Sequence, residues 1–146
     1  MTDTTRAGIL TRAHMDRLAT SLIAIADAPS DETLAAAPLI EAWAPVISLG
    51  RPCLMGPVHG HSAFRDGEHH ETAPILFIDP DAGYARSADQ WYRLGASVFE
   101  ADPSLVAYMR AKPTALLSLS DPVDYSASVD AYRTKIEGLV RSSLDA

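Results

Sequence analysis

The segment between Pro52 and Gly95 limits the fold more than any other part of this chain, because two strong turn signals divide it into three short strand-like runs. Asp-Gly and Asp-Pro-x-x-Gly supply glycines that accept positive φ and, in the second signal, a proline with a preset φ, and both features favour a chain reversal. The segment therefore predicts a small antiparallel three-stranded meander. Its expected elements are a strand over 53–59, a turn at Asp66-Gly67, a strand over 72–78, a turn at Asp79–Gly83 and a strand over 84–95.

Helical patterns flank this block on both sides. Apolar residues spaced three and four apart indicate helices over about 5–44. Helices over about 102–144 begin at Asp102-Pro103, an N-cap residue followed by proline at the first helical position. Residues 114–119 fit either a buried strand or a helical turn. The order of helices, strands and helices predicts one α+β domain over residues 1–146.

One continuous hydrophobic core is expected, because 47% of the residues are apolar and a chain of this length can bury such a core. The apolar run 75–78 favours a strand that is buried on both faces over an edge strand, with Pro74 at its start. The residues expected to share the core are Leu18, Leu22, Trp43, Phe77, Ile136 and Leu139.

The net charge of −7 is spread along the chain, with no acidic tail and no basic stripe. Binding to a phosphate backbone needs clustered Lys and Arg, so the sequence shows no footprint for direct nucleic-acid binding. No apolar stretch approaches the ~20 residues of a membrane span, and no signal-peptide pattern is present. Cys53 is the only cysteine, which excludes an internal disulfide. We therefore expect a cytoplasmic protein.

Four of the five histidines lie in the strand block and are the best candidates for chemistry. A two-residue turn at Asp66-Gly67 would place His59, His61 and His70 on one face of the sheet. Three imidazoles could ligate zinc and leave a fourth position open. The alternative is a solvated polar hairpin in which His61 makes a structural hydrogen bond near the Gly60 backbone.

The strand at Trp91 is the second candidate site. Alternation puts Trp91 and Arg93 on one side of the strand and Tyr92 on the other. Aromatic residues and arginine are enriched at protein interfaces, so the candidate interface residues are Trp91, Tyr92, Arg93 and Arg86. The alternative is that Trp91 belongs to the core. The sequence contains neither a Gly-x-Ser-x-Gly elbow nor a phosphate-binding glycine loop, and we assign no catalytic residue.

A recurring pattern runs through the same block, made of Gly60-His61, Asp66-Gly67, Thr72, an acidic turn, Ala85-Arg86 and Trp91–Gly95. In this pattern the chain resembles a bacterial family of unknown function. Members of that family tend to carry proline after Gly-His, Thr-Ser at the position of Thr72-Ala73, and Arg-Thr-x-x-Arg at the position of Arg86–Gln90. The resemblance covers the middle third of the chain and implies a small intracellular bacterial protein. It carries over no known activity.

Two functions of different classes compete. The first is a non-enzymatic, acidic interaction module that binds a partner macromolecule, in the simplest case another protein, and needs no cofactor. An inhibitor or regulator from a phage or other mobile element is a special case of this function. The alternative is a metal-binding protein or metal-dependent hydrolase that uses His59, His61 and His70 with zinc as its cofactor.

Overall fold

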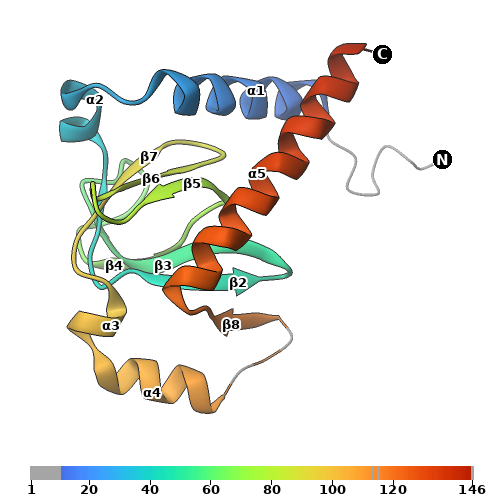
Figure 1. Cartoon of the computed structure of the whole chain (residues 1–146). Helices are drawn as coiled ribbons and strands as arrows, with labels where there is room; N and C mark the ends of the chain where they lie inside the picture. The colour runs from blue at the N-terminus through green and yellow to red at the C-terminus, as the bar shows by residue number, and fades with distance from the viewer. Residues whose placement is uncertain (1–10, 113, 115, 146) are drawn as a thin grey trace.

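The computed structural model describes residues 11–112, 114 and 116–145 and shows an α+β fold, with helices around a strongly curled mixed sheet (Figure 1). The strands follow the order β5-β6-β7-β1-β3-β2-β8. Strand β4 pairs with the edge of β3 that faces away from β1 and β2. The predicted simple meander is therefore wrong as a description of the whole sheet. The helices are α1 (Arg12–Asp27), α2 (Asp31–Ala36), α3 (Val98–Ala101), α4 (Pro103–Ala111) and α5 (Pro122–Asp145). The strands are β1 (Leu39–Ile40), β2 (Ala44–Ser48), β3 (Arg51–His59), β4 (Glu68–Glu71), β5 (Ile75–Asp79), β6 (Tyr84–Ser87), β7 (Trp91–Leu94) and β8 (Leu117–Leu119).

An antiparallel meander is present inside the larger sheet, but it consists of β5, β6 and β7. The segment 84–95, predicted as one strand, is a hairpin. The Ser87 hydroxyl accepts hydrogen bonds of 3.0 Å from the backbone N–H groups of Asp89 and Gln90 and so forms the turn. This turn contains neither glycine nor proline, which is why the composition did not reveal it. The turn at Asp79–Gly83 is confirmed, because Gly83 has φ +84° and donates a 2.8 Å hydrogen bond to the Asp79 carbonyl.

Strand β5 begins directly after Pro74, as expected, but it is the last strand at one end of the sheet. The expectation of a central strand is therefore wrong. Helix α5 packs along this strand, and Arg133 Nη1 donates a 2.9 Å hydrogen bond to the Leu76 carbonyl. The pairing of β5 with β6 shifts register between Ile75 and Phe77. A bulge of this kind puts one extra residue in the strand, and Phe77 is only half-buried.

The helices predicted to reach residue 44 end at Ala36, because residues 39–48 form β1 and β2. Proline disfavours helical backbone in the residue before it, and Pro38 lies just before β1. Strands β1 and β2 both pair with β3, and the connection from β1 to β2 crosses over Gly56. A Cβ at Gly56 would lie 2.7 Å from the Glu41 carbonyl oxygen, so only glycine allows this close approach.

Strand β4, which the sequence did not predict as a separate strand, pairs with β3. Gly56 lies opposite His70 and Val58 opposite Glu68, which leaves residues 60–67 as a loop in place of a two-residue turn. Asp66 holds this loop by accepting a 2.8 Å hydrogen bond from the Gly60 N–H. The predicted two-residue turn at Asp66-Gly67, which placed His59, His61 and His70 on one face, is therefore wrong.

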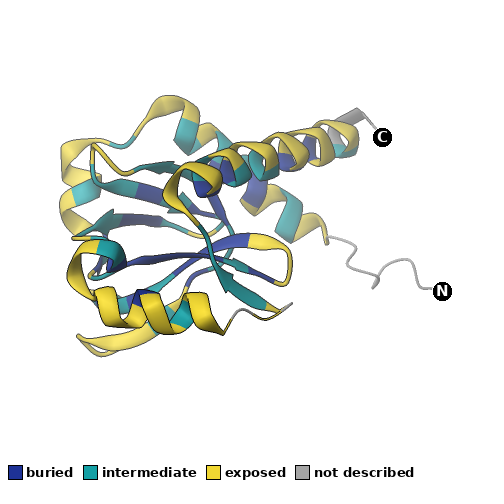
Figure 2. Ribbon diagram, turned by 60° about the horizontal axis from the view of Figure 1, so that its bottom comes forward, coloured by how far each residue is buried: buried dark blue, intermediate teal, exposed yellow. Residues whose placement is uncertain are grey.

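The buried side chains form three clusters, not one continuous core. Figure 2 shows that the buried residues lie on the sheet and on the inner sides of the helices. The cluster inside the curled sheet contains Trp43, as expected of a core anchor, together with Tyr125 and Val129 of α5. A second cluster lies between the sheet and helices α3 and α4. The third joins α1 and α5 around Leu18 and Ile136. Leu139 is 43% exposed, so its predicted place in the core is wrong.

Helix starts agree with the sequence more closely than any other feature. Ser30 and Asp102 each accept a backbone hydrogen bond as the N-cap of α2 and α4. The ambiguous segment 114–119 contributes strand β8. Residues 5–10 of the predicted first helix lie outside the described residues. None of the helices in the described part of the chain is long and apolar enough to cross a membrane.

Candidate functional site

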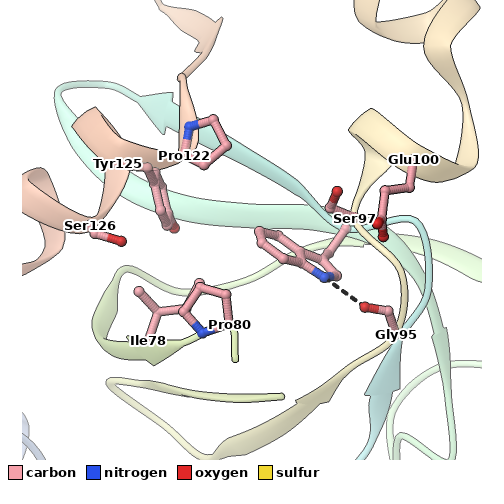
Figure 3. A pocket seen from close by; sticks show the side chains of 9 residues that line it. Ile78, Pro80, Gly95, Ser97, Glu100, Pro122, Tyr125 and Ser126 are labelled. Carbon is pink, nitrogen blue, oxygen red and sulfur yellow. Dashed lines mark hydrogen bonds between the residues drawn. The ribbon is translucent and has the colours of Figure 1, made fainter. Parts of the chain in front are cut away.

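A cavity of about 260 Å³ lies between the β7–α3 connection, the β5–β6 turn and the first turn of α5 (Figure 3). We call it the Trp43 pocket. Four segments that are far apart in the sequence contribute to it, because the curled sheet brings its two ends close to α5. The lining residues are Trp43, Ile78, Pro80, Gly95, Ser97, Glu100, Pro122, Tyr125 and Ser126.

Trp43 has a fixed position in this pocket. Its indole Nε1 donates a 2.9 Å hydrogen bond to the Gly95 carbonyl, which Figure 3 marks with a dashed line. Its backbone N–H donates to Ala96, and its carbonyl accepts a 2.8 Å hydrogen bond from Val98. Only 6% of the residue is exposed. These bonds tie the β7–α3 connection to the β1–β2 segment, so Trp43 cannot turn without breaking them.

Tyr125 forms the opposite wall and is equally well held. Its hydroxyl donates a 2.7 Å hydrogen bond to the Cys53 carbonyl, and its backbone N–H donates to the Asp121 carbonyl. Burial raises the pKa of the Tyr125 hydroxyl well above its ordinary value, so this group remains a neutral donor. Asp121 also accepts a 2.8 Å hydrogen bond from the Val123 N–H and so caps the start of α5.

Among the described residues that line the pocket, Glu100 alone carries a charge. The residue is exposed, and it forms no ion pair with any residue in the described ranges. The Ser97 hydroxyl lies beside it and does not cap α3. The pocket therefore combines an apolar, aromatic interior with a carboxylate at its edge. Such an arrangement suits a group that has an apolar stem and a cationic end.

The predicted interface residues divide between the two faces of the meander. Arg86, Trp91 and Arg93 lie on the outer face, where the Arg86 guanidinium stacks 5.4 Å from the centre of the Trp91 ring. Tyr84 continues this row, with its ring centre 5.6 Å from that of Trp91. Trp91 is nonetheless only 7% exposed. Tyr92 points into the sheet, is 2% exposed, and has a pKa raised to about 12 by burial.

The Arg86 side chain is held by a contact with helix α1. It donates a 3.0 Å hydrogen bond to the Ser21 hydroxyl, which in turn donates to the Ala88 carbonyl. Its Nε is buried and has no hydrogen-bond partner within the described part of the chain. Burial lowers the pKa of the guanidinium. Arg86 therefore joins α1 to the meander.

The histidine cluster is smaller than predicted. The ring centres of His61 and His70 lie 5.3 Å apart, and the Phe64 ring packs against both, 4.8 Å from His61 and 4.3 Å from His70. His59 pairs instead with Leu39 of β1. Burial, and then the neighbouring His61, lower the pKa of His70. Over the described residues, no three His, Cys, Asp or Glu side chains are placed to hold a metal ion.

His61 makes two hydrogen bonds with other parts of the protein. Its Nδ1 accepts a 3.0 Å hydrogen bond from the Ala63 N–H, so the ring proton of the neutral imidazole must lie on Nε2. Nε2 is 3.0 Å from the Gln90 amide, and donation from Nε2 requires that the amide oxygen face the ring. The Tyr92 hydroxyl is 3.3 Å from the same amide. His61 thus makes a structural hydrogen bond near Gly60, as expected, but as an acceptor from the main chain.

Sequence reasoning did not find Ser97, Glu100 or Tyr125 as site residues. Tyr125 lies four positions before Val129, so the helical spacing of the last helix contained a signal for its burial. No sequence pattern identified Glu100 as a site residue, because its neighbours in the sequence do not distinguish it from any other exposed acidic residue. Trp43 was predicted only as a core residue, and it lines the pocket as well.

Comparison with known proteins adds a family but no activity. No curated protein and no solved structure matches this chain. Residues 6–132, most of the chain, match a family of unknown function, DUF6634. The chain therefore belongs to this family of unknown function.

Proposed function

We propose that this protein is a non-enzymatic interaction module and that the Trp43 pocket takes up a basic side chain of a partner protein. The observation that carries the proposal is a preformed pocket with an aromatic interior and a single charged group, the carboxylate of Glu100. Over the described residues, no group of His, Cys, Asp or Glu side chains is placed to hold a metal ion and so to support the alternative, a metal-dependent hydrolase.

Preorganisation supports the proposal first. The side chains of Trp43 and Tyr125 are both held by hydrogen bonds to backbone carbonyls, of 2.9 and 2.7 Å. A pocket whose walls are already fixed loses little conformational freedom when it is filled, so more of the contact energy contributes to affinity.

The negative charge of Glu100 and of the whole chain is the second argument for a basic side chain in the pocket. The stem of a lysine would pack against Trp43 and Ile78 while its ammonium group reached the Glu100 carboxylate, because long cationic side chains bury their methylenes and keep the charge at a polar edge. The net charge of −7 adds a long-range attraction for a basic partner.

The rim of the pocket supports a protein as the partner. Pro80 and Pro122 line the cavity and are exposed, and the next residue, Val123, is 78% exposed. Apolar surface therefore continues beyond the cavity, where a small ligand would leave it uncovered. A polypeptide that inserts one side chain would cover this rim as well.

A fluorescence titration tests the pocket directly. The variant Trp91→Phe leaves Trp43 as the only tryptophan, so emission reports on the pocket. We expect Nα-acetyl-lysine amide to change this emission more strongly than Nα-acetyl-norleucine amide, which has the same stem without the charge. Adding Glu100→Gln should weaken lysine binding about threefold to fivefold, the range of a partly exposed ion pair, and leave norleucine unchanged.

A capture experiment tests the partner. Immobilised wild-type protein and the Glu100→Lys variant are incubated with host extract, and bound proteins are identified by mass spectrometry. The matched control is Glu137→Lys, which makes the same change of charge at an exposed position of α5. We expect one basic protein to be retained by the wild type and the control and lost from Glu100→Lys. Equal retention by all three proteins would contradict the role of the pocket.

A further inference from the structure

A second cavity, of about 230 Å³, lies between α1, α5 and the β2–β3 turn. We call it the α1–α5 cavity. It is separate from the Trp43 pocket, because the two share no lining residue. Its lining residues are His14, Leu18, Gly50, Arg51, Pro74, Ala88, Tyr132, Lys135, Ile136 and Leu139.

The floor of the α1–α5 cavity is apolar. Leu18 and Ile136 are 3% and 4% exposed and belong to the third core cluster, so the cavity is an opening of that cluster to the surface. Leu139 continues the apolar wall outward, where it is 43% exposed. An apolar body placed in this cavity would cover side chains that otherwise contact water.

The mouth of the cavity is cationic. Arg51 and Lys135 both line it, and among the described residues no Asp or Glu does. Neither makes an ion pair with another residue of the described ranges. Arg51 and Tyr132 line the same cavity. Burial raises the pKa of the Tyr132 hydroxyl, and the positive charge of Arg51 opposes this rise. The chain has 19 acidic and 12 basic residues, so a cavity lined by two cations and no acid runs against its overall charge.

We propose that the α1–α5 cavity binds a small amphipathic carboxylate, whose anionic group lies between Arg51 and Lys135 and whose apolar body rests on Leu18 and Ile136. The charges at the mouth select an anion, and the Tyr132 hydroxyl adds a hydrogen-bond donor. The apolar floor selects a hydrocarbon body and disfavours inorganic phosphate, which could not cover it. The cavity is smaller than the about 300 Å³ at which typical drug-sized sites begin, so the ligand is short, in the range of a medium-chain fatty acid.

Calorimetric titration of the full chain with octanoate tests this site. The variant combines Arg51→Gln and Lys135→Gln, two exposed residues whose replacement preserves the apolar floor. The matched control combines Arg65→Gln and Arg110→Gln, which removes two exposed cations from other parts of the surface. We expect the wild type and the control to bind octanoate equally and the cavity variant to bind it about tenfold more weakly, as two partly exposed charge pairs allow. Titration with 1-octanol should show binding as weak as that of the cavity variant.

The location is checked by amide chemical shifts on the same complex. The largest octanoate-induced changes should fall on Gly50, Ala88 and Lys135. The proposal is overturned if octanoate does not bind at millimolar concentration, if octanol binds as tightly as octanoate, or if the cavity variant binds as well as the control. These outcomes leave the proposed function untouched, because the Trp43 pocket is tested by a different probe and a different variant.

Discussion

The β2–β3 turn contains an unfavourable residue whose replacement should stabilise the protein. Leu49 has φ +52° and Gly50 has φ +80°. Two successive positive φ values characterise the type I′ turn, which favours asparagine at its first central position. A residue with a Cβ loses about 1–2 kcal/mol in left-handed backbone, and asparagine tolerates this conformation better than leucine does. The Leu49 side chain is 62% exposed, so its replacement sacrifices little buried apolar surface.

We expect Leu49→Asn to raise the free energy of unfolding by about 0.5–1 kcal/mol, which is part of the left-handed penalty. The backbone N–H of residue 49 donates a 2.8 Å hydrogen bond to the Leu116 carbonyl, and the variant retains it. A gain of this size should raise the melting temperature by about 2–4 °C for a chain of this length. Urea denaturation should show a higher midpoint with an unchanged slope.

The control is Ile23→Asn. Ile23 is also 62% exposed, but it lies inside α1, where the backbone is right-handed. Asparagine is no better a helix former than isoleucine, so this variant should be as stable as the wild type or slightly less stable. If Leu49→Asn is no more stable than Ile23→Asn, the turn is not strained and the reasoning is wrong.

Three further predictions follow from buried groups. Tyr125→Phe removes the 2.7 Å hydrogen bond to the Cys53 carbonyl and should cost about 1–2 kcal/mol in thermal denaturation, whereas Tyr108→Phe, at a residue 59% exposed, should change stability by less than about 0.5 kcal/mol. Burial raises the pKa of the Cys53 thiol from 9.0 to about 11, so the folded protein should resist a thiol reagent at about pH 8. Its stability should fall as the pH rises from 9 to about 11, because the unfolded chain loses the thiol proton first. Fast labelling of the native state would contradict the burial. The pKa of His70 is lower in the folded protein than its ordinary value of 6.5, so His70 contributes stability above pH 6.5 that is lost as the pH falls through the folded-state pKa. His70→Phe should therefore reduce the loss of stability on acidification, whereas His69→Phe should not.

The Trp43 pocket shows where prediction from the sequence ends. Trp43 was predictable as a core residue, because base rates favour burial of tryptophan. That Trp43 lines one pocket with Glu100 and Tyr125 was not predictable, since these residues belong to separate segments that meet only when the sheet curls. The histidines show the same limit. The register of β3 and β4 decides which imidazoles meet, and it differs from the one that a two-residue turn at Asp66-Gly67 would give.

The features that the sequence determined by itself are those whose physics lies within a few residues. Ser30 and Asp102 cap helices through hydrogen bonds to N–H groups three positions away, and the turn at Asp79–Gly83 depends on one aspartate and one glycine. The α+β class and the family also follow from the sequence. The tertiary structure alone decided the strand order, the division of the core into three clusters and both cavities. Each of these depends on pairs of residues distant in the chain, whose contact energy exceeds local preference only after the chain has folded.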